Sequence, residues 1–155
     1  MGYSELCKGR ASMPQQIYFV TVTSQARTPW FKELCTARIV VKEMKDLHSH
    51  GDVDSLAWVL MPDHLHWLFQ LRQGSSLSIV MRKLKGRSTA SIRAYRNVSG
   101  KIWQRGFHDH AIRREEDLVA IARYIVANPL RAGLVSSLSD YSLWDAKWLD
   151  CGASG

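Results

Sequence analysis

The chain has 155 residues, 46% of them hydrophobic and 10% aromatic, which suits one domain with a real core and excludes a disordered protein. No apolar run approaches the roughly 18 residues of a membrane helix, and no signal peptide is recognisable. The three cysteines, Cys7, Cys35 and Cys151, are too widely spaced for a C-x-x-C metal or disulfide motif. We therefore expect a cytoplasmic protein with reduced thiols and no membrane partner.

The net charge of +7 is unevenly distributed along the chain. Between Arg72 and Arg114 there are eleven Lys or Arg residues and a single acid, Asp109, so this segment carries +10 and the remainder −3. A charge run often marks only a solvated helix face. Because opposite charges are nearly missing here, the pattern favours a polyanionic partner, and nucleic acid in particular.

The periodicity of apolar residues predicts alternating strands and helices. In chain order we expect a strand at 17–23, a helix at 31–48, a hairpin of strands at 55–61 and 64–71, a basic helix at 76–96, a strand within 101–113 and a helix at 115–128. Pro129 is expected to end the last helix, because the residue before proline disfavours α geometry. This order predicts an α+β, ferredoxin-like sandwich whose antiparallel sheet carries helices mainly on one face.

The predicted elements lie within residues 17–135. They are preceded by a basic arm at 1–16 and followed by a short tail at 136–155.

The strand at 64–71, with sequence HLHWLFQL, has two chemically different faces. Because side chains alternate along a strand, His64 and His66 share one face, while Leu65, Trp67 and Phe69 make the other face apolar. Two imidazoles at this spacing can bind one divalent metal. Periodicity alone leaves open whether they are ligands or polar residues on a solvated face.

The last predicted helix places Tyr124 and Asn128 one turn apart on one face. A tyrosine hydroxyl can act as a covalent nucleophile, and an asparagine carbonyl is a hard-oxygen metal ligand. From spacing alone, a half-buried packing tyrosine and a helix C-cap explain these two residues better.

Four blocks of sequence together resemble one family. They are GRASMPQQIYFVTVTSQARTPWF, MPDHLHWLF, WQRGFHDHAIR and YIVANPLRAGLV. In this order, from about residue 8 to residue 135, they resemble the REP-associated tyrosine transposases of the single-tyrosine HUH superfamily. The H-hydrophobe-H pair alone is a weak signal, whereas the four blocks in sequence are specific.

The resemblance implies an HUH version of the ferredoxin-like or RRM-like sandwich, with residues 17–135 as a catalytic domain. It implies that His64 and His66 bind a divalent metal, Mg²⁺ or Mn²⁺, and that Tyr124 is the nucleophile. Asn128 matches a polar third ligand that is often glutamine in the superfamily, and its side chain is one methylene shorter. The implied substrate is single-stranded DNA at REP-type hairpins, cut through a 5′-phosphotyrosine intermediate that leaves a free 3′-OH.

Basic residues in several segments are candidates for DNA contact. They are Lys8, Arg10, Arg82, Lys83, Lys85, Arg87, Arg93, Arg96, Arg105 and Arg131. Trp103 and Phe107 either stack on bases or belong to the core. His108 and His110 form a second H-x-H with an acidic centre, which does not fit the HUH pattern. They either support the metal site or contact phosphate, or are simply surface residues.

Three functions fit these residues. The first is a metal-dependent single-stranded DNA nickase and strand transferase. The second is a non-catalytic RRM-like nucleic-acid-binding module. The third is a phosphodiesterase that uses water, with Tyr124 structural. A denaturation-stable protein–DNA adduct distinguishes the first from the others, and the sequence leaves a monomer and a homodimer equally open.

Overall fold

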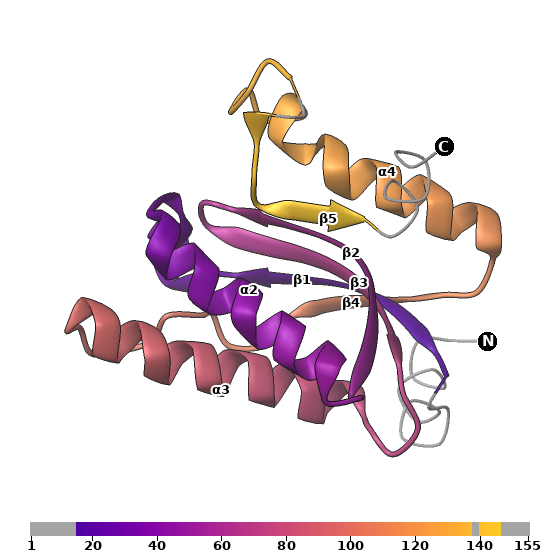
Figure 1. The fold of residues 1–155 in the computed structure, drawn as a ribbon, viewed down its shortest axis with the longest axis horizontal. Coiled ribbons are helices and arrows are strands. Elements are labelled where there is room, and N and C mark those ends of the chain that lie inside the picture. Colours follow the sequence, from indigo (N-terminus) through magenta and orange to yellow (C-terminus); the bar gives the residue numbers. More distant parts are fainter. Residues whose placement is uncertain (1–14, 138–139, 147–155) are drawn as a thin grey trace.

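The computed structural model describes residues 15–137 and 140–146, which form one antiparallel sheet packed between helices (Figure 1). The sheet has five strands in the order β4-β1-β3-β2-β5. Their bounds are β1 Ile17–Thr23, β2 Val53–Met61, β3 His64–Leu71, β4 His108–Ile112 and β5 Trp144–Ala146. The helices are α2 Leu34–Ser49, α3 Leu77–Arg96 and α4 Glu115–Arg131, with short 3₁₀ turns η1 Gln25–Arg27 and η2 Trp30–Lys32. The predicted α+β class is confirmed.

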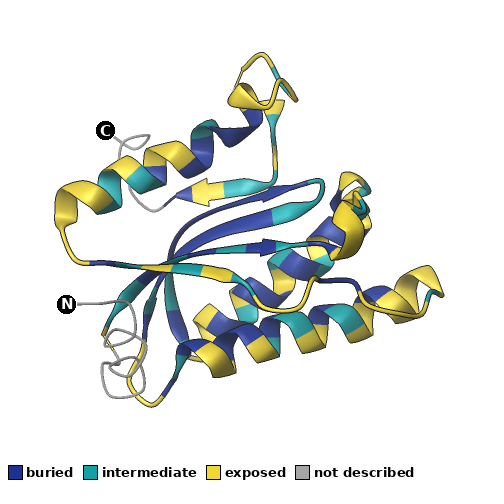
Figure 2. Ribbon diagram, turned by 180° about the vertical axis from the view of Figure 1, so that it is seen from behind, coloured by how far each residue is buried: buried dark blue, intermediate teal, exposed yellow. Residues whose placement is uncertain are grey.

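The helices are divided unequally between the two faces of the sheet (Figure 1). On one face, α2 and α3 cover a core that includes Val20, Trp67 and Phe69. On the other face, α4 packs Ile125 against Leu68 and its neighbours. Figure 2 shows the result, with the central strands buried and the outer side of α4 exposed. The helix that carries Tyr124 therefore covers its own face of the sheet.

Local sequence sets the ends of these elements. Glu33 caps α2 by accepting hydrogen bonds from the backbone N–H groups of Cys35 and Thr36. The Thr36 hydroxyl also donates to this carboxylate, and together these bonds lower the pKa of Glu33 to about 2. Ser76 caps α3 in the same way, by accepting from the backbone N–H of Ile79. Asn97 ends α3 in the left-handed conformation, with φ of 53°.

The expectation that Pro129 ends the last helix is wrong, since α4 continues to Arg131. Proline removes only its own N–H bond to the preceding turn, and that loss falls in the last turn of the helix. Hydrogen bonding resumes immediately, because the N–H of Ala132 donates to the carbonyl of Asn128 at 2.9 Å and that of Leu134 to Pro129 at 3.0 Å. Arg131 thus stays on the helix, two turns after Tyr124.

The strand expected within 101–113 is present as β4. The residues before it form a loop that Lys85 holds by donating to the backbone carbonyls of Gln104 and Gly106. Trp103 is buried in the core beneath α3 and donates its indole N–H to Ser88 at 2.9 Å. Trp103 is therefore a core residue, and it lies in the loop before β4.

The expected C-terminal tail also contributes to the sheet, because β5 pairs with the edge of β2. The basic arm at 1–16 is described only at Gln15 and Gln16, so Lys8 and Arg10 lie outside the described residues, as do Cys7 and Cys151. No helix in the described part of the chain is long and apolar enough to cross a membrane.

Candidate active site

The two histidines of β3 lie side by side on the sheet face that α4 covers. Strand alternation sends both side chains to this face, and their ring centroids are 4.7 Å apart. His66 is buried, while His64 is half-buried. The predicted pairing of the imidazoles is therefore present in the fold.

Each of these imidazoles is held through its Nδ1 atom. A hydrogen bond of 2.9 Å joins His66 Nδ1 to the hydroxyl of Thr21 on β1. His64 Nδ1 lies 2.8 Å from the Asp63 carboxylate, which also accepts from Arg27 Nε at 3.0 Å. Metal-binding histidines commonly have one ring nitrogen fixed in this way. The contacts described leave Nε2 of each ring as the nitrogen available to a ligand.

The environment of His66 keeps its ring uncharged. Burial lowers its pKa from 6.5 to about 4, and the positive charges of His64 and Arg131 add to the effect. At neutral pH the ring is therefore deprotonated, which is the form that binds a metal without first losing a proton.

Tyr124 lies on α4 and approaches the histidine pair from the helix that covers this face of the sheet. Its ring centroid is 5.9 Å from that of His66 and 6.4 Å from that of Phe19 on β1. The side chain is nevertheless accessible, because the residue is 43% exposed. The guanidinium carbon of Arg131 lies 3.9 Å from the centre of the Tyr124 ring. The phenol thus stands between a buried imidazole and a cation, within reach of solvent.

Asn128, one turn after Tyr124, is buried, and its side-chain Nδ2 has no hydrogen-bond partner within the described residues. Such an unpaired amide is costly in a folded protein and invites an explanation. Within residues 15–137 and 140–146, no group of three or more His, Cys, Asp or Glu side chains is arranged to hold a metal. A metal at the histidine pair would therefore need an amide or a non-protein oxygen to complete its ligands.

The second histidine pair lies on the same face as the first. In the register of β4 with β1, His108 is opposite Thr21 and His110 is opposite Phe19. Thr21 is in turn opposite His66 on β3, so one row across the sheet joins His108, Thr21 and His66. Both residues of the second pair are exposed. They border the candidate site without joining the first pair.

Comparison with known proteins gives the family. The family model described as Transposase IS200 like matches residues 12–128. A REP-associated tyrosine transposase of Escherichia coli (strain K12) is 32% identical over 119 residues, which cover 76% of this chain and 66% of that protein. A Haemophilus influenzae protein provisionally given the same name is 32% identical over 139 residues, with coverages of 81% and 76%. The chain belongs to the family of IS200-like transposases.

Solved structures agree with this IS200-like fold. One is a REP-associated tyrosine transposase bound to a REP hairpin, with a TM-score of 0.71 and 23% identity, covering 85% of this chain and 76% of that one. Another, from Deinococcus radiodurans, has a TM-score of 0.54 and 17% identity, covering 72% of this chain and 88% of that one. The fold is thus that of the REP-associated tyrosine transposases, within the HUH-type group that the sequence resembles.

The DNA-contact candidates of this IS200-like transposase do not form one surface. Those on α3 lie on the sheet face opposite Tyr124, and several have partners inside the protein. Lys83 pairs with Asp52 at 3.0 Å, and Arg93 donates to the carbonyl of Gly100 at 2.7 Å. Arg96 lies 3.7 Å from the Glu33 carboxylate, and Lys85 holds the loop before β4. The others on this helix, Arg82 and Arg87, are exposed, as is Arg105 in the loop. Arg131 alone among the described candidates contacts Tyr124.

Residues that the sequence did not single out complete the site of this transposase. Thr21 and Asp63 fix the two imidazoles, Arg27 fixes Asp63, and Phe19 packs against both His66 and Tyr124. Asp63 was detectable, since it directly precedes His64. Thr21 was not, because its contact depends on the register between β1 and β3.

Proposed function

We propose that this transposase cuts and rejoins single-stranded DNA beside REP-type hairpins, using Tyr124 as nucleophile and a divalent metal bound by His64, His66 and Asn128. The observation that carries the proposal is the 5.9 Å separation of the Tyr124 and His66 rings, with His64 next to His66. The phenol and imidazoles come from different elements of one chain, and a protein that only bound DNA would not need them together.

The residues present suit a divalent metal. Both imidazoles keep Nε2 available, His66 is uncharged at neutral pH, and the amide of Asn128 is buried one turn from Tyr124 without a described partner for its Nδ2. Nitrogen and hard-oxygen donors of this kind bind Mg²⁺ or Mn²⁺. When bound, the metal would withdraw charge from the phosphate oxygens and orient the phosphorus.

The chain's own residues then account for the remaining chemistry. The Tyr124 oxygen forms a bond to phosphorus while the bond from phosphorus to the 3′ oxygen breaks. The products are a 5′-phosphotyrosine and a free 3′-OH, with the phenol proton released to solvent and a proton from solvent taken up by the departing 3′ oxygen. Arg131, which packs against the Tyr124 ring, places positive charge beside the phosphate that approaches it. Attack by a 3′-OH on the phosphotyrosine reverses these steps and needs no other energy source.

The expected DNA follows from the relatives. Two proteins about one third identical carry the REP-associated name, and a structure of the same fold is bound to a REP hairpin. We extend that substrate to this chain, which spans 66% of the E. coli relative. The exposure of Tyr124 supports access by a strand that leaves the hairpin stem.

The decisive experiment uses labelled hairpin DNA with a single-stranded flank, in Mg²⁺ or Mn²⁺. We expect Tyr124→Phe to abolish cleavage while hairpin binding stays nearly intact, and His64→Ala to abolish it through loss of metal. Tyr95→Phe is the matched control, because Tyr95 is also exposed but lies on α3, across the sheet. Cleavage by the Tyr124 variant at the wild-type rate would contradict a tyrosine nucleophile. The function would then be that of a phosphodiesterase that uses water. Loss of cleavage in the Tyr95 variant would show that the assay reports folding.

A further inference from the structure

A groove runs between α2 and the edge formed by β2 and β5, on the sheet face opposite Tyr124. It consists of two adjoining hollows of about 450 and 540 Å³. Both hollows are lined by Lys45, Trp58 and Asp145, so they form one continuous depression. Each is of a size that accommodates a small organic molecule. None of the chemistry at Tyr124 uses this groove.

One wall of the groove is cationic. Arg38, Lys42 and Lys45 follow one another along α2 at intervals of four and three residues, which puts them on one face of the helix. All three are exposed. Lys42 pairs with Asp46 at 2.8 Å, whereas Arg38 and Lys45 have no ion pair within the described residues. Seven residues of helix separate these two cations by about 10 Å along the groove.

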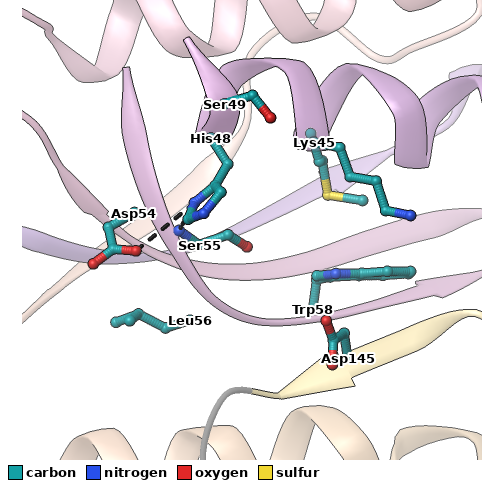
Figure 3. A pocket seen from close by; sticks show the side chains of 9 residues that line it. Lys45, His48, Ser49, Asp54, Ser55, Leu56, Trp58 and Asp145 are labelled. Carbon is teal, nitrogen blue, oxygen red and sulfur yellow. Dashed lines mark hydrogen bonds and ion pairs between the residues drawn. The ribbon is translucent and has the colours of Figure 1, made fainter. Parts of the chain in front are cut away.

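The floor of the groove is apolar at its centre and offers a hydrogen-bond acceptor beside it. In Figure 3 the indole of Trp58 lies between Lys45 of α2 and Asp145 of β5. Trp58 and Asp145 are directly opposite each other in the pairing of β2 with β5. The backbone N–H of Ala146 donates to one oxygen of Asp145 at 2.9 Å, and the second oxygen has no hydrogen-bond partner among the described residues. Farther along, His48 lies 3.7 Å from Asp54, and its Nδ1 accepts a hydrogen bond from the backbone N–H of Ser55 at 3.1 Å (Figure 3).

We propose that this groove binds a single-stranded segment of nucleic acid, with Arg38 and Lys45 holding phosphates and Asp145 accepting a hydrogen bond from the amino group of a base. Spaced cations beside an apolar floor are the features that bind unpaired strands. A carboxylate among cations weakens phosphate binding but suits the exocyclic amine of cytosine. In a base pair one hydrogen of that amine is already donated to guanine, whereas an unpaired cytosine offers both, so the hollows suit an unpaired strand. The groove goes beyond the proposed reaction, because it is a second DNA surface that does not depend on Tyr124.

The first test measures the binding of a fluorescent oligodeoxycytidylate of about ten nucleotides by anisotropy at several salt concentrations. For the double variant Arg38→Gln with Lys45→Gln, we expect Kd to rise about tenfold at 0.15 M salt and the salt slope to fall by about 1.4, the value for two lost phosphate contacts. The control, Arg72→Gln with Lys101→Gln, removes two exposed cations that lie outside the groove and are not among the DNA-contact candidates. An equal loss in both double variants would overturn the proposal, because it would reflect net charge alone.

The second test addresses the base. Wild-type protein should bind oligodeoxycytidylate several-fold more tightly than oligothymidylate, which lacks an exocyclic amine, and Asp145→Ala should remove this preference. A preference that survives in the variant would contradict the role of Asp145. Tyr124→Phe should bind both oligonucleotides like the wild type, so failure of the nuclease proposal and failure of the groove are separately visible. Thermal melting of each variant checks that these surface changes leave the fold intact.

Discussion

The hydrogen bond between Thr21 and His66 gives the sharpest structural prediction. Thr21→Val keeps the shape of the side chain but removes the hydroxyl that lies 2.9 Å from His66 Nδ1. His66 is only 9% exposed, so Nδ1 would lose its partner and have little access to water. An unpaired buried polar group costs about 1–3 kcal/mol of folding free energy. Loss of a bond that orients a metal-binding imidazole costs about 10–100-fold in metal affinity.

Two measurements on Thr21→Val test these consequences. Cleavage of hairpin DNA is titrated with Mn²⁺, and unfolding is followed in urea. We expect the half-saturating Mn²⁺ concentration to rise about 10–100-fold and the free energy of unfolding to fall by about 1–3 kcal/mol. Thr23→Val is the control, since Thr23 is on the same face of β1 and the described hydrogen bonds include none from its hydroxyl. An unchanged Mn²⁺ requirement with reduced stability would refute the reasoning, because Thr21 would then serve packing alone.

Two further predictions concern the same site. The pKa of His66 is about 4 in the folded protein and 6.5 without the fold, so the unfolded chain binds more protons between these values. Stability should therefore be fully present above pH 6.5 and should decrease by about 3 kcal/mol as the pH falls to 4. Urea unfolding of wild type and His66→Gln across this range checks it, and an equally steep loss in the variant would contradict the assignment. Separately, Arg131→Gln should slow cleavage about fivefold at saturating DNA, because the positive charge beside the phosphate is lost, which corresponds to about 1 kcal/mol of transition-state stabilisation. Arg123→Gln is its exposed control on α4, and equal slowing in both would point to a general charge effect.

Local patterns predicted the histidine half of the site well. The alternation of HLHWLFQL fixed the bounds of β3, its apolar face and the common direction of His64 and His66. Leu118, Ala122 and Ile125, at helical spacing, form the core side of α4. Tyr124 and Asn128 could be placed on one helix face, but spacing favoured a packing role for Tyr124 and a helix C-cap for Asn128. The proximity of Tyr124 to His66 is a tertiary contact, and the resemblance to known transposases carried that prediction.

What the sequence missed depends on which helix covers which face. The sequence could not tell that α3 lies across the sheet from Tyr124, so contact of its basic residues with DNA stays a prediction. The distribution of Lys and Arg along the chain does not reveal on which face of the sheet α3 packs. The three-residue strand β5 is too short to give an alternating pattern, so the groove beside Trp58 could not be anticipated. Pro129 was misleading because a proline in the last helical turn removes very little bonding.

The measurement closest to the central claim is the chemical identification of the covalent intermediate. The protein is incubated with hairpin DNA and Mn²⁺, denatured and digested, and the peptide that carries nucleotide is sequenced by mass spectrometry. We predict that a 5′ phosphate is attached to the Tyr124 hydroxyl and that the adduct survives denaturation. DNA that is cleaved without any adduct, or with the nucleotide on another residue, would contradict the assignment of Tyr124 as nucleophile.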